Sequence, residues 1–152
     1  MILRFIVFLV LNFGALAIGA IFTGKGVPSD WYTSLNKAPW TPPGWMFGFA
    51  WTTIMICFSA FMALLWPKTE YTSFLVGWFT IQWILNVAWN PAFFHFHHVG
   101  MALFIILLLT AVIGYMLFYA KPLLKSYTLF LLPYFVWLLI ATSLNAYILV
   151  NN

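Results

Sequence analysis

The sequence predicts an all-α integral membrane protein, a single domain over residues 1–152 in which five transmembrane helices form a bundle and a long first loop acts as a lid. Hydrophobic residues make up 65% of the chain and charged residues only 5%, against roughly 25% charged in a typical globular domain. Five apolar runs are each long enough to cross a hydrocarbon core of roughly 30 Å. A backbone in lipid must satisfy its own hydrogen bonds, and the runs lack the alternation of barrel strands, so each is expected to be a helix.

The five runs lie at about residues 3–22, 44–66, 71–91, 99–119 and 123–150. A polar turn at residues 67–70 ends the second run. Pro91 is expected to end the third, and residues 120–122 to separate the fourth from the fifth, because proline fits a helix start better than a helix interior. Pro133 lies inside the fifth run and is expected to bend it, since proline removes a backbone donor.

The first run also has features of a signal peptide, because residues 17–20, Ala-Ile-Gly-Ala, resemble a small-residue cleavage site. Its apolar stretch is longer than a usual signal core. We therefore expect it to remain as the first span of a multi-pass protein.

The basic residues predict an orientation. With five spans, one face carries Arg4, Lys68, Lys121 and Lys125, and the other carries Lys25 and Lys37. Lysine and arginine are enriched on the cytoplasmic side of membrane proteins. The count of four against two predicts a cytoplasmic N-terminus and a C-terminus outside.

The distribution of charge excludes several classes of function. Six scattered basic residues do not form the clustered patch that nucleic-acid binding needs. No span carries Asp, Glu, Lys or Arg in its middle, whereas ion pumps and proton-coupled transporters normally use such groups. The lone Cys57 makes neither an intrachain disulfide nor a cysteine metal site. The interior of the bundle is therefore expected to hold no ionisable group.

The connection at residues 23–43 is unusually long, and loops of this length tend to be functional lids or disordered segments. Trp31, Tyr32 and Trp40 make it too apolar for a solvated linker, and three prolines stiffen its end. The same aromatic residues would also suit an interfacial belt. A belt does not need a whole rigid loop, which favours the lid.

Polar residues recur on one stripe of the third run. Gln82, Asn86 and Asn90 are spaced four apart and so share a helical face. Amides are expensive in lipid, so this stripe should face the bundle interior. The amides could join helices through hydrogen bonds. For Asn86, midway along the helix beside aromatic residues, contact with a ligand is favoured.

Two further stripes present aromatic residues to the interior. The fifth run carries Pro133, Trp137, Ala141 and Asn145 at intervals of four, and the second carries Trp45, Gly48, Trp51 and Met55 at helical spacing. Such stripes are often core packing or interfacial anchors. However, buried indole N–H groups need partners, and apolar walls with a few polar groups are the usual composition of a small-molecule site.

His95, His97 and His98 lie between the third and fourth runs. Their spacing could ligate a transition metal or a haem iron, but no Cys, Asp or Glu stands nearby to complete a site. A short interfacial loop is the favoured interpretation, and no metal site is predicted. The small pair Ala15 and Gly19 in the first run could support a helix–helix or dimer contact.

Four segments in combination resemble the translocator protein family, also called the tryptophan-rich sensory proteins or peripheral benzodiazepine receptors. They are residues 31–45 (WYTSLNKAPWTPPGW), 86–94 (NVAWNPAFF), 133–137 (PYFVW) and 141–145 (ATSLN). The resemblance runs from about residue 5 to 147. It implies a five-helix bundle, commonly a homodimer, and a bacterial member in a cell membrane.

The resemblance also implies a function. The family binds porphyrins such as protoporphyrin IX, and synthetic benzodiazepine-site ligands, with no obligatory cofactor. Carried over by position, the ligand-binding residues would be Tyr32, Trp40, Trp51, Asn86, Trp137 and Ala141. The porphyrin would be a ligand of a receptor or sensor, or the substrate of a light-dependent oxidative degradation in which Tyr32 and Trp137 would be the redox-active aromatic residues.

Two further functions are less well supported. A porphyrin or lipid transporter would normally need coupling residues and repeat symmetry, and neither is visible in the sequence. Vertebrate members end their last helix with a sterol-associated pattern that includes a basic residue. Here Leu144 and Tyr147 are followed by no Lys or Arg, so sterol handling is not expected.

Overall fold

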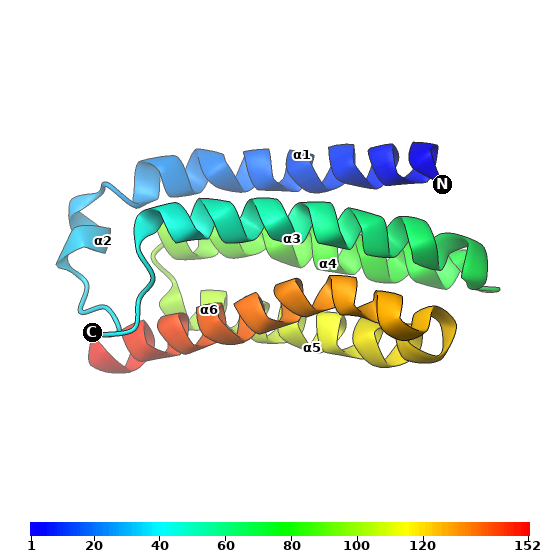
Figure 1. The fold of residues 1–152 in the computed structure, drawn as a ribbon. Coiled ribbons are helices and arrows are strands. Elements are labelled where there is room, and N and C mark those ends of the chain that lie inside the picture. The colour runs from blue at the N-terminus through cyan, green and yellow to red at the C-terminus, as the bar shows by residue number, and fades with distance from the viewer.

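The computed structural model describes residues 1–152 and consists of helices without strands (Figure 1). In chain order the elements are α1 (Ile2–Gly26), α2 (Asp30–Ser34), α3 (Gly44–Leu65), the 3₁₀ helix η1 (Trp66–Lys68), α4 (Thr72–Phe94), α5 (Val99–Leu124), the 3₁₀ segment η2 (Lys125–Leu131) and α6 (Leu132–Asn151). The all-α class and the five long helices of a membrane bundle are confirmed.

Three continuous helical segments are long and apolar enough to cross a membrane by length and composition: Ile2–Gly26, Gly44–Lys68 and Val99–Asn151. The last of these contains both α5 and α6, which are joined through η2. The fourth helix, α4, has 23 residues but does not meet the same apolar criterion. Its three amides lower the hydropathy of a helix that is otherwise long enough to span.

Two prolines do not act as helix boundaries in the way the sequence predicts. Pro91 lies inside α4, which continues to Phe94, and Pro122 lies inside α5, which continues to Leu124. Both stand within the last turn or so of their helices. A proline there removes only one backbone hydrogen bond, and its fixed φ is compatible with the helix.

The predicted bend at Pro133 is also wrong. Residues 125–131 form a 3₁₀ segment, and α6 begins at Leu132 with Pro133 in its first turn. Proline is favoured there because the N–H it lacks would have no helical partner. The direction of the chain changes earlier, at Lys125, whose φ is +50°.

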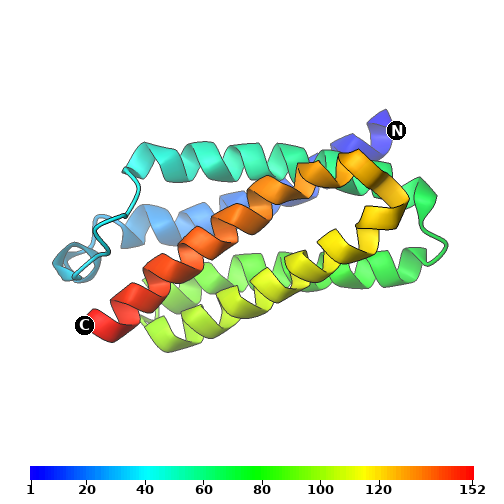
Figure 2. The same cartoon turned by 60° about the horizontal axis from the view of Figure 1, so that its bottom comes forward.

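The long helices form a ring in which α1 contacts α3 and α4, α4 contacts α5, α5 contacts α6, and α6 returns to α3. The N-terminus lies at one end of the bundle, and the C-terminus and α2 lie at the other (Figure 1). Near η2, α6 is close to α3, and the two helices diverge toward the α2 end (Figures 1 and 2). The bundle therefore closes tightly at one end and opens at the other.

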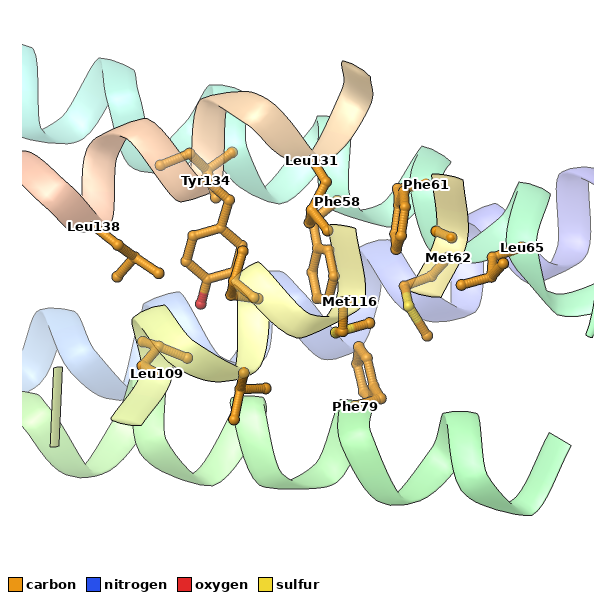
Figure 3. Packing of buried hydrophobic residues seen from close by; sticks show 14 of the residues in the cluster. Phe58, Phe61, Met62, Leu65, Phe79, Leu109, Met116, Leu131, Tyr134 and Leu138 are labelled. Atoms are coloured by element: carbon orange, nitrogen blue, oxygen red, sulfur yellow. The ribbon is translucent and has the colours of Figure 1, made fainter. Parts of the chain in front are cut away.

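The end remote from α2 is a solid core (Figure 3). Its largest fully buried side chains include Phe58, Phe61, Met62, Leu65, Leu131 and Tyr134. Polar groups in this region are paired: the Tyr134 hydroxyl donates to Gln82 Oε1 at 3.1 Å, and Asn12 Nδ2 donates to Ser59 Oγ at 2.9 Å. These bonds satisfy groups that would otherwise be costly in an apolar interior.

Candidate functional site

A cavity of about 710 Å³ occupies the half of the bundle nearest α2. It lies between α1, α3, α4, α5 and α6, and the loop that contains α2 contributes to its wall. Its volume falls within the roughly 300–1,000 Å³ of small-molecule sites. Its principal lining residues are Ala15, Gly19, Tyr32, Lys37, Phe47, Gly48, Trp51, Asn86, Trp89, Asn90, Phe93, Phe94, Trp137, Ala141 and Asn145.

The structure brings five of the six predicted ligand-binding residues to this cavity: Tyr32, Trp51, Asn86, Trp137 and Ala141. They come from the lid, α3, α4 and α6, and so from four separate parts of the chain. Their assembly shows that the stripes face one interior space. That they bind a ligand stays a prediction.

Trp40, the sixth residue, lies outside the cavity lining, with 55% of its surface exposed. A turn closed by Thr41 N–H donating to Ala38 O at 2.9 Å places it on the outer side of the loop. There its Nε1 donates to Ser143 Oγ at 3.1 Å, and its ring packs edge-on to Tyr147. The expected position in the cavity is corrected: Trp40 attaches the lid to α6.

The two tryptophans of the cavity wall are held by aromatic neighbours. The Trp137 ring packs edge-on against Phe47 with centroids 5.3 Å apart, and Trp51 packs against Tyr134 at 6.0 Å. Edge-to-face pairs of this kind are favoured by the ring quadrupoles. The walls are therefore fixed before any ligand arrives.

The three amides of α4 have different partners. Gln82 accepts the Tyr134 hydroxyl and lies outside the cavity, and Asn90 Nδ2 donates to the Asn86 backbone carbonyl at 3.1 Å. The Asn86 side chain is only 8% exposed, lines the cavity and makes no hydrogen bond to the protein. A buried amide without a partner is costly, so Asn86 is available to a bound molecule.

Small residues on α1 let the amide helix approach closely. A methyl group built at Gly19 would lie 2.8 Å from Asn90 Nδ2. Gly19 and Ala15 both line the cavity. The predicted small-residue pair is therefore used within the bundle, between α1 and α4.

The lid is attached to the α4 end of the bundle through rings. Trp31 stacks on His97 with centroids 4.0 Å apart and planes 17° apart, and Tyr32 packs against Phe94 at 5.6 Å. His97 holds a positive φ of 56°, an uncommon conformation for a residue with a side chain. Burial raises the pKa of the Tyr32 phenol above its ordinary value, so the hydroxyl stays protonated and can donate a hydrogen bond.

Several functional positions were not singled out from the sequence. With its amide oriented to match its neighbours, Asn145 accepts from Trp89 Nε1 at 3.3 Å and from Leu103 N at 3.2 Å, and donates to Val99 O at 3.2 Å. This tie joins α4, α5 and α6 beside the cavity. Phe93 follows Asn86 by seven residues, and this helical spacing could have identified it as part of the same face.

Lys37 also lines the cavity, and it is the one charged side chain that does so among the eight of the chain. Its Nζ lies 4.6 Å from the centroid of the Tyr32 ring. The expectation of an interior without ionisable groups is therefore wrong at the lid. It was made from the spans alone, whereas Lys37 enters from the loop.

Comparisons with known proteins agree with this architecture. The model of the TspO/MBR family matches residues 5–150. The chain is similar to the tryptophan-rich protein TspO of Chlorobaculum tepidum, at 36% identity over 88% of this chain and 86% of the relative. It is also similar to protein CrtK of Rhodobacter capsulatus, at 34% identity over 85% and 80% of the two chains, and to the translocator protein of Homo sapiens, at 33% over 84% and 78%.

Proposed function

Because the chain belongs to the TspO/MBR family of membrane proteins, as its loop and helix motifs predicted, we propose that it is a membrane receptor or sensor for a flat, largely apolar ligand. The proposed ligand class is the porphyrins of the protoporphyrin IX type. Synthetic benzodiazepine-site ligands would compete for the same cavity. Neither class requires a metal or cofactor held by the protein.

One observation carries the proposal: the cavity combines aromatic walls with a buried amide that has no protein partner. Trp51 and Trp137 offer flat indole faces, and Asn86 offers a donor and an acceptor between them. An apolar ring system can stack on the indoles, and one polar group on it can satisfy the amide. A cavity that served only as a packing defect would gain nothing from burying Asn86.

The test is a titration of the purified protein in detergent micelles with protoporphyrin IX, followed by quenching of tryptophan fluorescence. We expect saturable binding at micromolar ligand, weakened by Trp51→Ala and by Asn86→Leu. Trp45→Ala is the matched control, because Trp45 is 69% exposed and lies outside the cavity. Absence of saturable quenching, or equal loss in all three variants, would overturn the proposal.

A second candidate is light-dependent oxidation of the bound porphyrin. It is favoured by the placement of Tyr32 and Trp137 on one cavity, since electron-rich rings beside an excited porphyrin and oxygen can pass or trap radicals. Illumination of the complex in air should then yield a discrete product, and Tyr32→Phe and Trp137→Phe should abolish it while binding survives. Bleaching that both variants leave unchanged would remove this candidate.

We also propose that the lid faces the outside of a bacterial cell membrane. The end of the bundle that holds η1 and η2 carries four basic residues and the lid end carries two. In a Cys57→Ser background, Ser34→Cys in the lid should react with a membrane-impermeant maleimide on intact cells. Ser126→Cys in η2 should react only after lysis, and the reverse pattern would invert the orientation.

A further inference from the structure

We propose that Lys37 is the specificity-determining residue of the cavity. It would select ligands that carry a carboxylate on a flat apolar body and orient them with that carboxylate at the lid. The inference rests on the proposed function and deepens it, because it names the charge and the orientation of the ligand. It concerns a residue of the loop, outside the predicted set of binding residues.

The backbone on both sides of Lys37 is fixed. Asn36 N–H donates to Asn152 Oδ1 at 2.8 Å, and Asn152 Nδ2 donates back to the Asn36 carbonyl at 3.3 Å. On the other side, Ala38 is buried, and its carbonyl accepts from Thr41 N at 2.9 Å and Thr41 Oγ1 at 2.7 Å. A lysine in a free loop would move in solvent, but this one is directed at the cavity.

The charge of Lys37 has no acidic partner in the cavity. Asp30 and Glu70 are the only acidic residues of the chain, and neither lines the cavity. The ammonium instead lies over the neutral ring of Tyr32. A cation–π contact of this kind is weaker than a charge-assisted hydrogen bond to a carboxylate. An anionic ligand group would therefore be favoured as the partner of Lys37.

The polarity of the cavity gives the ligand a direction. Lys37 lies at the lid, whereas Asn86, Trp51 and Trp137 lie on the helices and bring no charge. An ionised carboxylate among the helices would be desolvated without a counter-charge, which is costly. At the lid the same group meets an ammonium close to water. A molecule with acid groups on one edge would bind with that edge toward Lys37.

The test compares protoporphyrin IX with its dimethyl ester, which has the same ring system without the negative charge. Dissociation constants are measured by tryptophan quenching in uncharged micelles for the wild-type protein and for Lys37→Gln. The two ligands partition differently into detergent, but that difference cancels when the acid-to-ester ratio of one protein is divided by that of the other. We expect Lys37→Gln to reduce the preference for the acid about tenfold, the scale of one hydrogen bond to a charged group.

Two control variants accompany the measurement. Lys37→Arg should keep the preference for the acid, and Lys121→Gln, at the opposite end of the bundle, should leave it unchanged. Unchanged binding of the ester by Lys37→Gln shows that the cavity is still folded. A ratio that agrees within about twofold between wild type and Lys37→Gln, including equal weakening of both ligands, overturns the role of Lys37. Failure of the wild-type protein to bind either ligand would instead remove the proposed function.

Discussion

The two halves of the bundle are both rich in aromatic residues, yet one is solid and the other is hollow. In the half near η2, Phe58 stacks on Phe61 and Phe79 and packs edge-on to Tyr134, and these rings fill the space between the helices. In the half near the lid, α3 and α6 diverge and the aromatic residues line a cavity (Figure 2). Aromatic content alone therefore does not make a binding site.

Residue size and hydrogen bonding distinguish the halves. The hollow half places Gly19, Gly48 and Ala141 where the solid half has large side chains. Along α4 the change occurs within one turn: Gln82 is paired with Tyr134, and Asn86 has no protein partner. Missing volume together with an unpaired amide is what distinguishes the site from the core.

The largest expected effect is in the solid half. Phe58 is fully buried, so Phe58→Ala should lower the free energy of unfolding by about 3–5 kcal/mol, because the removed ring leaves a void that its neighbours cannot fill. Phe47→Ala only enlarges an existing cavity and should cost clearly less. Unfolding in mixed micelles with increasing denaturing detergent measures both. Equal losses would break the distinction between the halves.

Filling the cavity should separate binding from stability. Ala141→Leu puts a branched side chain beside Trp137, so affinity for protoporphyrin IX should fall about 100-fold, with little change in thermal stability. Its counterpart in the packed region is Ala63→Leu, which should cost about 1–3 kcal/mol of stability by overpacking. Retained affinity in Ala141→Leu would show that the ligand lies elsewhere.

The amides of α4 provide a matched pair. Gln82→Leu leaves the Tyr134 hydroxyl unpaired in the core and should cost about 1–3 kcal/mol of stability without changing ligand affinity. Asn86→Leu breaks no protein hydrogen bond and should keep stability while weakening ligand binding about tenfold. Thermal denaturation and fluorescence titration of both variants give the comparison. The opposite assignment of effects would mean that Asn86 is structural.

The smallest expected effect concerns the attachment of the lid. Trp40→Phe keeps the ring against Tyr147 but removes the hydrogen bond to Ser143, a loss of about 1 kcal/mol. Ligand dissociation, followed by stopped-flow fluorescence, should become about fivefold faster because the lid opens more often. Trp45→Phe serves as the control outside the lid attachment. Equal dissociation rates in all three proteins would show that the lid does not retain the ligand.

The sequence by itself determined the class of the molecule and the faces of its helices. Scarcity of charge required lipid as the solvent, and lipid required helices, because a spanning backbone must bond to itself. Spacing by four placed Asn86 with Gln82, and Trp137 with Ala141, on inward stripes. These inferences succeed because they depend on the helical period and on transfer energies, which are local properties.

Only the tertiary structure decided what each inward residue does. Whether an amide of α4 is paired depends on which side chain of α6 faces it, and that follows from the divergence of two helices distant in sequence. Trp40 leaves the cavity because of a turn, and Lys37 reaches it because Asn36 is tied to the last residue of the chain. Such contacts depend on long-range packing, to which the local pattern of residues is insensitive.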